Sequence, residues 1–384
     1  GAAALVTIPT FADLSTLASP NAGRVAFGPN GPNYQVVKFQ TADDPGVPQI
    51  TAGLELVNAL FQGEKETAEQ VFAAASANTP LPSFALAAGK TLSATVSVTT
   101  VHNHGEDVIG MLEGSDPVLK NEYVVISAHL DHIGMSPMLP GCHALNPVAA
   151  AGDSTASGLT ADGPQCDTID NGADDDGSGT VTALEIAQKI ASLDPHPKRS
   201  ILFVWHTGEE KGLLGSTYYT DHPSVPRDSI VAQLNMDMVG RGDAWDMTGT
   251  RKNGSFMHGG ANTLYLVGSR RLSTELGNLV EQVNADDHHG FDFDYSFDAD
   301  GHPENVYCRS DHYEYARYGI PITFFTTGLH SDYHQVTDEP EYIDYDHMAR
   351  VGNLVEDVAV HVANLDHRVV VDHPKPDPHG VCKQ

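Results

Sequence analysis

YVVISAHLD, residues Tyr123–Asp131, is a continuous apolar run that ends in polar residues. This pattern is typical of a strand that is buried on both faces of a sheet. Segments of the same kind follow it along the chain: SILFVWHT (200–207), IVAQLNMDM (230–238), TLYLVG (263–268) and PITFFTTG (321–328). Together these segments predict the strands of one buried sheet.

Helical segments alternate with these strands. One helix is predicted between Gly177 and Pro195, and two more are predicted near residues 272–284 and 347–366. In the first helix the apolar residues recur at helical spacing, at Val181, Leu184, Ala187 and Ile190. Buried strands that alternate with helices are typical of an α/β fold with helices on both faces of the sheet. We therefore predict a three-layer α/β domain with a mixed, mainly parallel central sheet.

The pattern of predicted secondary structure changes near Thr91. Residues 1–91 open with the apolar run GAAALVTI and continue with short strand-like and helix-like segments, and no cluster of chemically reactive side chains occurs among them. A strand-rich pattern then begins the part of the chain that carries the candidate site. A length of 384 residues favours one large domain and one smaller domain. We expect a small β-rich domain over residues 1–91 and a larger domain, which carries the candidate site, over residues 92–384.

The composition excludes several classes of function. The chain has 21 Lys and Arg residues against 51 Asp and Glu residues, a formal net charge of −30. A surface of this sign repels phosphate backbones and anionic lipid headgroups, so a nucleic-acid partner is not expected. No apolar run reaches the roughly 18 residues that a membrane-spanning helix needs. Acidic side chains together with 20 His residues are well suited to binding divalent cations.

The cysteines predict disulfides. The four Cys residues, at positions 142, 166, 308 and 382, form no CxxC pair, which argues against a thiolate zinc site. An even number of Cys residues in a chain without a recognisable signal peptide is typical of a mature exported protein, so we expect a secreted or periplasmic location. Of the three possible pairings, Cys142–Cys166 with Cys308–Cys382 is the most economical. Free buried cysteines are the alternative.

Polar residues follow the predicted strands at the point where each strand ends. In parallel α/β sheets, ligands bind beyond the carboxyl ends of the strands. The residues concerned are His129, Asp131, Glu209, Glu210, Asp237 and His334. Three further carboxylates, Asp174, Asp175 and Asp176, lie directly before the first predicted helix. We expect these side chains to gather at one edge of the sheet.

The chemistry of these side chains favours a metal centre. Zinc in catalytic sites binds His and carboxylate ligands, about three for one ion, and a larger number indicates two ions that share a bridging carboxylate. Taken singly, a His at a strand end is usually a surface residue, and a run of aspartates is usually the start of a helix or a calcium loop. Independent surface residues have no reason to gather at one sheet edge. An ionised Asp237 among apolar neighbours is also costly unless it is paired or binds a metal.

Five motifs occur in a recognisable order: AHLDH (128–132), GADDDGSG (172–179), TGEEKGLLGS (207–216), NMDM (235–238) and DYHQVTDE (332–339). As a set, they resemble the di-zinc exopeptidase family of bacterial leucyl aminopeptidases, aminopeptidase Y and glutamate carboxypeptidase II. The resemblance covers about residues 91–366 and implies the zinc-exopeptidase, or phosphorylase/hydrolase-like, architecture. The N-terminal segment resembles a protease-associated domain, and a plain extension of the catalytic sheet is the alternative.

The resemblance implies which side chains bind the metals. The expected ligands of two zinc ions are His129, Asp175, Glu210, Asp237 and His334. Asp175 would bridge both ions, in a loop with a constrained peptide between Asp175 and Asp176. His129 and Asp237 would complete one site, and Glu210 and His334 would complete the other.

The resemblance also implies which residues act on the substrate. Glu209, next to a ligand but not itself bound to metal, resembles the general base that takes a proton from a metal-bridging water and returns it to the leaving amine. Asp131 resembles the carboxylate that orients His129. Tyr333 and Tyr307 resemble residues that stabilise the oxyanion in different members of the family, and we favour Tyr333. A packed tyrosine is the alternative for either.

These expectations lead to a secreted, zinc-dependent aminopeptidase that acts on peptides, mainly at hydrophobic N-terminal residues. A carboxypeptidase of the glutamate carboxypeptidase type is the alternative. It needs a cationic side chain to bind the terminal carboxylate of the substrate, whereas an aminopeptidase needs an acidic or carbonyl group to bind the free amine. The candidate arginines are Arg241, Arg251, Arg309 and Arg317. A one-zinc glutaminyl cyclase and a non-catalytic binding protein on the same scaffold are less well supported, since every expected ligand and Glu209 are present.

Overall fold

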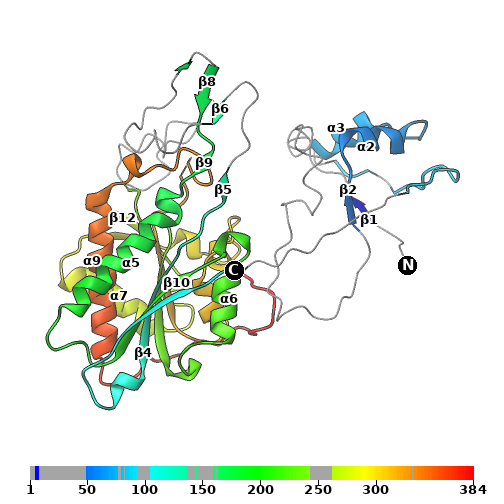
Figure 1. Cartoon of the computed structure of the whole chain (residues 1–384). Helices are drawn as coiled ribbons and strands as arrows, with labels where there is room; N and C mark the ends of the chain where they lie inside the picture. The colour runs from blue at the N-terminus through cyan, green and yellow to red at the C-terminus, as the bar shows by residue number, and fades with distance from the viewer. Residues whose placement is uncertain are drawn as a thin grey trace. The chain divides into compact units, whose positions relative to one another are not determined.

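The computed structural model contains two compact units, Gly1–Asn103 and His104–Gln384, which are considered separately. The residues that the structure describes are 5–7, 49–76, 79–81, 83–93, 104–135, 143–144, 159–160, 163–242, 262–330 and 332–384. Figure 1 follows the course of the chain and labels its helices and strands. Within these segments, no helix is both long enough and apolar enough to cross a membrane.

The described part of the first unit contains two short strands and two helices. Strand β1 (Leu5–Thr7) pairs in parallel with β2 (Gln49–Thr51). Helices α2 (Leu54–Phe61) and α3 (Ala68–Ser76) follow. Because much of this unit lies outside the described residues, the β-rich domain expected over residues 1–91 stays a prediction.

A mixed sheet of seven strands forms the centre of the second unit. Its strands are β3 (Val108–Leu112), β4 (Tyr123–His129), β10 (Ser200–His206), β11 (Ile230–Met236), β12 (Thr263–Val267), β13 (Asp292–Asp294) and β14 (Ile322–Thr326). They lie in the order β13-β12-β14-β11-β4-β10-β3. The inner strands β14, β11, β4 and β10 run parallel, whereas β3 is antiparallel to β10 and β12 is antiparallel to β14. The predicted mainly parallel sheet is therefore confirmed.

Short strands also occur outside this sheet, between β4 and the helix that follows it. They are β5 (Gly134–Met135), β6 (His143–Ala144), β7 (Leu159–Thr160), β8 (Gly163–Cys166) and β9 (Ile169–Asp170). Strand β5 pairs antiparallel with β9, and β8 pairs with both β6 and β7. These pairs are separate from the central sheet.

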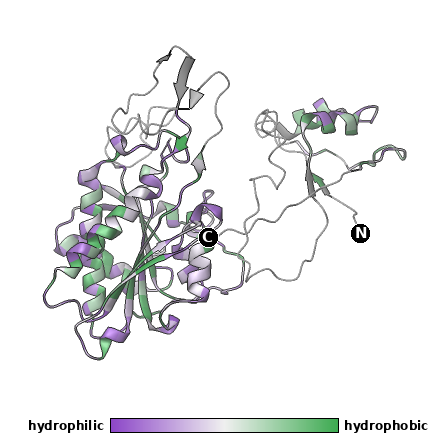
Figure 2. Ribbon diagram, viewed as in Figure 1, coloured by the Kyte–Doolittle hydropathy of each residue, from purple (hydrophilic) through white to green (hydrophobic). Residues whose placement is uncertain are grey.

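Helices cover both faces of the central sheet (Figure 1). One face carries α5 (Gly179–Ala191), α7 (Thr274–Asp286) and α9 (Tyr345–Asn364), and the other carries α6 (Leu214–Asp221) and α8 (His312–Ala316). Each face has its own buried apolar cluster. Figure 2 shows hydrophobic central strands and helices with hydrophilic outer sides. The three-layer arrangement predicted from the sequence is confirmed.

Helix α5 forms where predicted, but its buried face differs from the apolar repeat. The repeat alone would bury Val181 and Leu184, yet these side chains are 49% and 62% exposed. The helix packs against α9, which approaches so closely that a Cβ atom on Gly352 would lie 3.0 Å from Thr182. Because this close crossing requires small side chains, Thr182 and Ala183 face the interface, and Val181 and Leu184 face outward.

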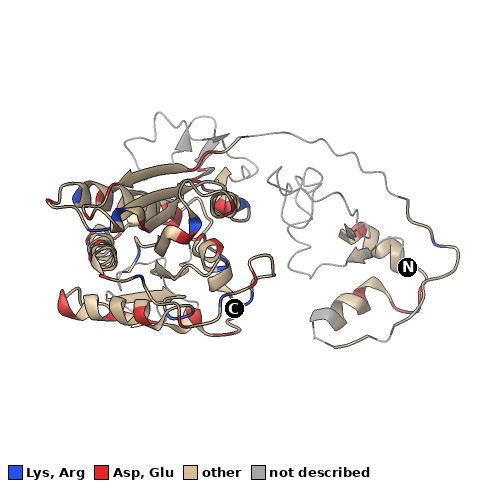
Figure 3. Ribbon diagram, turned by 90° about the horizontal axis from the view of Figure 1, so that it is seen from below, with Lys and Arg blue, Asp and Glu red and all other residues tan. Residues whose placement is uncertain are grey.

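The register of the strands brings their carboxyl ends to one edge of the sheet. His129, the last residue of β4, pairs with His206, the last residue of β10. On the other side of β4, Asn235 pairs with Ser127, so that Asp237 comes level with His129. Acidic positions in the rest of the unit are spread over its helices and loops (Figure 3). The sheet edge is thus the place where the candidate residues gather.

The structure contains the expected disulfide between Cys308 and Cys382, which are 74 residues apart. Cys142 and the side chain of Cys166 lie outside the described residues. A cross-link over this distance restricts the unfolded chain, so the double replacement of Cys308 and Cys382 by Ser should lower the free energy of unfolding by about 4 kcal/mol. Urea unfolding of this variant, beside the wild type with and without dithiothreitol, measures the effect. An unchanged midpoint would contradict the expectation.

Candidate metal centre

The loop before α5 is built around Asp175. Gly172 begins it with a φ of 61°, and a Cβ atom there would lie 2.3 Å from the carbonyl oxygen of Asp175, so only glycine fits. The Asp338 carboxylate accepts the backbone N–H groups of Asp174 and Asp175 at 3.0 and 3.1 Å. The constrained peptide expected between Asp175 and Asp176 is a cis bond. These contacts hold the Asp175 side chain at the sheet edge.

The two flanking aspartates are used by the fold. Asp174 accepts the N–H group of Gly240 at 2.6 Å. Asp176 lies within ligand distance of His129 and Asp237. Its oxygens, however, already accept backbone N–H groups, including that of His129 at 3.0 Å. Asp176 therefore positions the strand end, and Asp175 is the aspartate that faces the site.

The two carboxylate oxygens of Asp175 face different histidines. Oδ1 lies 3.2 Å from Nε2 of His129, and Oδ2 lies 3.1 Å from Nε2 of His334. On the first side, Oδ1 of Asp237 lies 3.7 Å from Nε2 of His129. On the second side, Oε2 of Glu210 lies 3.0 Å from Nε2 of His334. The structure thus brings the expected ligand side chains together, with one oxygen of Asp175 facing each histidine.

Asp131 orients His129 and the loop that carries Glu209. Nδ1 of His129 lies 3.0 Å from the carbonyl oxygen of Asp131, which can only accept, so the N–H group is on Nδ1 and the lone pair of Nε2 faces the site. The carboxylate of Asp131 is farther from Nδ1, at 3.9 Å. It accepts the backbone N–H group of Glu209 at 3.1 Å instead. The group that orients the ring is therefore the carbonyl oxygen of Asp131.

His132 is a site residue that the sequence analysis did not select. Its Nδ1 lies 2.7 Å from Oε1 of Glu210 and 3.9 Å from Oδ2 of Asp175. Its ring meets the ring of His334 edge-on, with the centroids 5.6 Å apart. The signal that points to it is the second histidine of AHLDH, three residues after His129, in the loop that leaves β4.

Several polar atoms of this group are buried without an aligned hydrogen bond to any described residue. They are Nε2 of His129, both ring nitrogens of His132, Oδ2 of Asp175, Oε1 of Glu210 and Nε2 of His334. Burying polar atoms without partners is costly. Imidazole nitrogen and carboxylate oxygen are the ligands that zinc takes in catalytic sites. The residues present therefore fit divalent cations of the zinc type.

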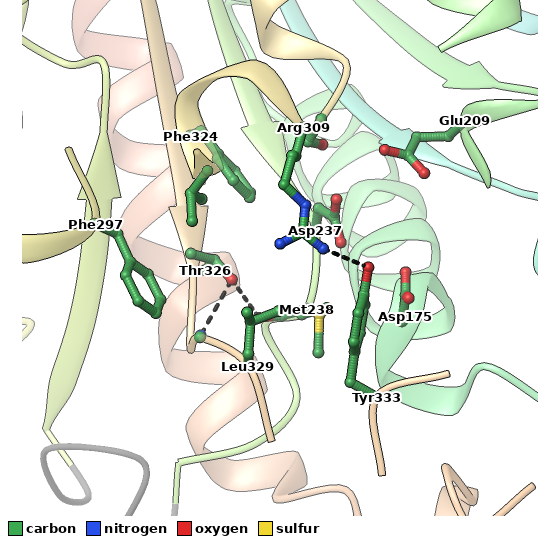
Figure 4. Close-up of a pocket in the computed structure, with 13 residues that line it drawn as sticks. Asp175, Glu209, Asp237, Met238, Phe297, Arg309, Phe324, Thr326, Leu329 and Tyr333 are labelled. Atoms are coloured by element: carbon green, nitrogen blue, oxygen red, sulfur yellow. Dashed lines mark hydrogen bonds between the residues drawn. The ribbon is translucent and has the colours of Figure 1, made fainter. Parts of the chain in front are cut away.

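A pocket of about 440 Å³ opens beside these residues (Figure 4). Asp175, Glu209 and Asp237 lie on one side of it. Its apolar wall is formed by Met238, Phe297, Val306, Phe324 and Leu329. Arg309 lies between the two sides, and its Nη2 donates a hydrogen bond of 2.9 Å to the hydroxyl of Tyr333. The pocket can therefore hold an apolar side chain beside a cluster of carboxylates.

Comparison with known proteins identifies the family. The sequence pattern of peptidase family M28 matches residues 107–359, which make up more than half of the chain. This chain belongs to peptidase family M28. Leucine aminopeptidase 1 of Paracoccidioides brasiliensis strain Pb03 is 32% identical to this chain over 193 residues, which cover 48% of this chain and 44% of the relative. The match thus spans less than half the length of this curated relative.

Solved structures are similar to the M28 chain at lower identity. LapA aminopeptidase of Legionella pneumophila is 22% identical, with a TM-score of 0.46, over 67% of this chain and 56% of that protein. BSAP, a zinc aminopeptidase of Bacillus subtilis, is 22% identical, with a TM-score of 0.45, over 66% of this chain and 49% of that protein. Glutaminyl cyclase of Porphyromonas gingivalis is also 22% identical, with a TM-score of 0.45, over 66% and 76%. Likeness at this level does not separate one activity from another.

Burial and nearby charges set the protonation of the carboxylates in the M28 site. Burial raises the pKa of Glu209 well above its ordinary value, and the carboxylate of Asp237 adds to this effect, while His129 opposes it. Burial acts on Asp175 in the same direction, but the nearby imidazoles of His129 and His334 hold its pKa below the ordinary value. Asp175 is thus kept ionised, as a ligand must be, and Glu209 has a high affinity for a proton.

The two candidate tyrosines of the M28 site occupy different places. Tyr333 lines the pocket, directly before His334. Tyr307 is buried, with its ring 4.4 Å from the guanidinium carbon of Arg271, and it is not among the residues that line the pocket. Burial raises the pKa of both hydroxyls above the ordinary value. Of the two hydroxyls, that of Tyr333 is the one placed to meet a ligand in the pocket.

Proposed function

We propose that this protein is an aminopeptidase that uses two zinc ions. The observation that carries the proposal is the position of Asp175, whose two oxygens face two separate sets of ligands. His129 and Asp237 would hold one ion, and Glu210 and His334 would hold the other. When bound, the ions would lower the pKa of water and polarise the carbonyl group of the scissile peptide bond.

Glu209 would act as the general base. Its Oε2 lies 3.9 Å from Nε2 of His129, and its backbone N–H group is held by Asp131. Unlike Glu210, it belongs to none of the groups of described residues whose atoms lie close enough to share a cation. Its raised pKa favours the uptake of a proton. From this position it can take a proton from the attacking water and return it to the leaving amine.

The charges of the pocket favour an N-terminal amine over a C-terminal carboxylate. Three carboxylates line the pocket, whereas Arg309 is the one arginine among its described lining residues, and it already donates to Tyr333. Arg241 and Arg317 are buried in ion pairs with other Asp and Glu side chains. Arg251 lies outside the described residues. The acidic partner that an aminopeptidase needs is therefore present, and a free arginine for a substrate carboxylate is not found on the described pocket wall.

The apolar wall of the pocket favours a hydrophobic first residue in the substrate. Met238, Phe297, Phe324 and Leu329 offer contacts to an aliphatic or aromatic side chain. The leucine aminopeptidases that the chain resembles in sequence support the same preference. The partner of the site would be a peptide.

Dipeptides blocked at one end distinguish the candidate activities. The zinc-loaded protein should hydrolyse leucyl-leucine amide, which has a free amine, and leave N-acetyl-leucyl-glutamate, which has a free C-terminal carboxylate, intact. The opposite pattern would support a carboxypeptidase of the glutamate carboxypeptidase type. Hydrolysis of neither dipeptide, with both metals bound, would support a non-catalytic binding protein. Leucine, phenylalanine and glutamate anilides then test the apolar wall, and the first two should react faster.

Tyr333 would stabilise the oxyanion that forms during hydrolysis. Replacing Tyr333 by Phe should lower kcat about 100-fold and leave KM within a few-fold of the wild type, since a donor to the oxyanion acts in the transition state. Tyr307→Phe is the matched control, because it removes the same hydroxyl from a buried position outside the pocket lining, and its kcat should stay near that of the wild type. Equal losses in the two variants would contradict the assignment. Steady-state kinetics on leucine anilide measures both.

The first unit and the location of the protein are part of the proposal. From the sequence, we assign residues 1–91 to a domain like the protease-associated domain and residues 92–384 to the catalytic domain. The first compact unit of the structure ends a little later, at Asn103. The Cys308–Cys382 disulfide supports a location outside the cytoplasm, since disulfides persist in oxidising compartments. Limited proteolysis that yields a stable fragment starting between residues 91 and 104 would support the division.

A further inference from the structure

We propose that His132 is a further protein ligand of the second cation, the one held by Glu210 and His334, and that it makes this cation the more tightly bound of the two. The inference rests on the proposed two-metal function. The side chain of His132 is 9% exposed. One of its ring nitrogens forms, with oxygens of Asp175 and Glu210, a group of potential ligand atoms that all lie within 4.8 Å of one another.

A hydrogen bond to Glu210 does not account for the position of His132. Nδ1 lies 2.7 Å from Oε1 of Glu210, yet the two atoms are not aligned as donor and acceptor, and neither has another aligned partner among the described residues. The same combination of a short distance and no alignment occurs at Nε2 of His129 and of His334, both expected ligands. Atoms that point at a common third atom, and not at each other, show this geometry.

The loop around Asp175 is shaped to admit the ring of His132. A Cβ atom on Gly172 would lie 2.5 Å from Cγ of His132, so the absence of a side chain at Gly172 leaves the space that the ring occupies. On its other side the ring meets that of His334, with an angle of 74° between the planes. Two imidazoles in this edge-on arrangement can each direct a nitrogen to one point without overlapping.

The two cation sites would then differ in chemistry. The first would have one imidazole and two carboxylates, and the second would have two imidazoles and two carboxylates. Imidazole suits zinc and cobalt better than it suits hard ions such as magnesium or manganese. Zinc should therefore fill the second site first, and His132 should account for much of the difference in affinity.

Zinc binding to the full-length wild type, His132→Ala and His132→Asn tests the proposal. Asparagine keeps an N–H donor near the position of Nδ1 but offers no imidazole, so it separates a ligand from a hydrogen-bond donor. In competition with a chelator, both variants should bind one of their two zinc ions at least about tenfold more weakly than the wild type. The affinity for the other ion should change little. The visible spectrum of the cobalt-loaded protein should change in both variants.

Each outcome supports or overturns the role of His132. If His132→Asn binds zinc as tightly as the wild type, the residue is a positioning residue that acts through a hydrogen bond, and the proposal is wrong. Unchanged affinity in both variants is equally contrary to it. If the wild type itself binds fewer than two ions at the site, it is the proposed two-metal function that fails. If a variant does not fold, proton NMR of the cobalt-loaded wild type still tests the proposal. Three ligand histidines should give three shifted imidazole N–H resonances, and two ligand histidines should give two.

A group remote from this site needs a control in the metal count. Asp287, His289 and Asp357 also place potential ligand atoms within 4.8 Å of one another. Asp357→Asn, introduced into the wild type and into both His132 variants, removes a carboxylate from that group. The affinity difference caused by His132 should be the same with and without this change.

Discussion

Glu209→Gln should lower kcat by about 10²–10⁴-fold while the protein keeps two bound zinc ions. The substitution preserves the size and the backbone N–H group that Asp131 holds at 3.1 Å, so the loop should keep its shape. It replaces a carboxylate, which can take up a proton, by an amide, which cannot do so near neutral pH. Kinetics on leucine anilide, with elemental analysis of the same samples, measures both quantities.

The matched control for this change is Glu185→Gln on the exposed side of α5, which should leave kcat unchanged. A Glu209→Gln protein with full turnover and full metal content would show that another group accepts the proton. A Glu209→Gln protein that loses zinc would show that Glu209 is a ligand, contrary to its proposed role.

Asp175→Asn should abolish tight zinc binding and, with it, activity. A neutral amide cannot supply two anionic oxygens to two cations, so the affinity of both sites should fall by more than the roughly 10–100-fold that the loss of an outer-shell partner costs. Zinc should raise the unfolding temperature of the wild type, because it binds the folded state, and this rise should be lost in the variant. Thermal unfolding with and without zinc, beside metal analysis, provides the readout.

Asp346→Asn, an exposed position in the first turn of α9, serves as the control for Asp175→Asn and should keep both the zinc content and the thermal shift. Loss of one ion with full retention of the other in Asp175→Asn would contradict the bridging role. In that case the carboxylate would belong to a single site.

Much of the fold could be predicted because apolar runs report burial directly. The strand around Val125 and those ending at His206 and Met236 are buried on both faces, so their sequences are mainly apolar. The buried polar residues among them, Ser127, Gln233 and Asn235, hydrogen-bond to one another. The order of these strands in the sheet fixes which loops meet, and the strand-end rule then places His129 and Asp237 together. No single motif carries this information, because each one has a common structural explanation of its own.

What could not be predicted depends on distances that only the fold sets. The exposed Val181 follows from the close approach of α9, which the local repeat does not encode. His132 differs from an ordinary loop histidine only because Glu210, far along the chain, lies 2.7 Å away. The sequence does not distinguish the roles of Tyr307 and Tyr333. Packing places Tyr307 against Arg271 and Tyr333 in the pocket.

The far C-terminal segment supports the wall of the pocket. Cys382 is bonded to Cys308, which lies between the lining residues Val306 and Arg309, and the side chain of Gln384 accepts the backbone N–H group of Tyr307 at 3.1 Å. Removing the residues after position 381 would therefore loosen the apolar wall that is proposed to receive the first residue of a peptide. The selectivity among substrates would decrease, while the side chains of the metal centre would keep their positions.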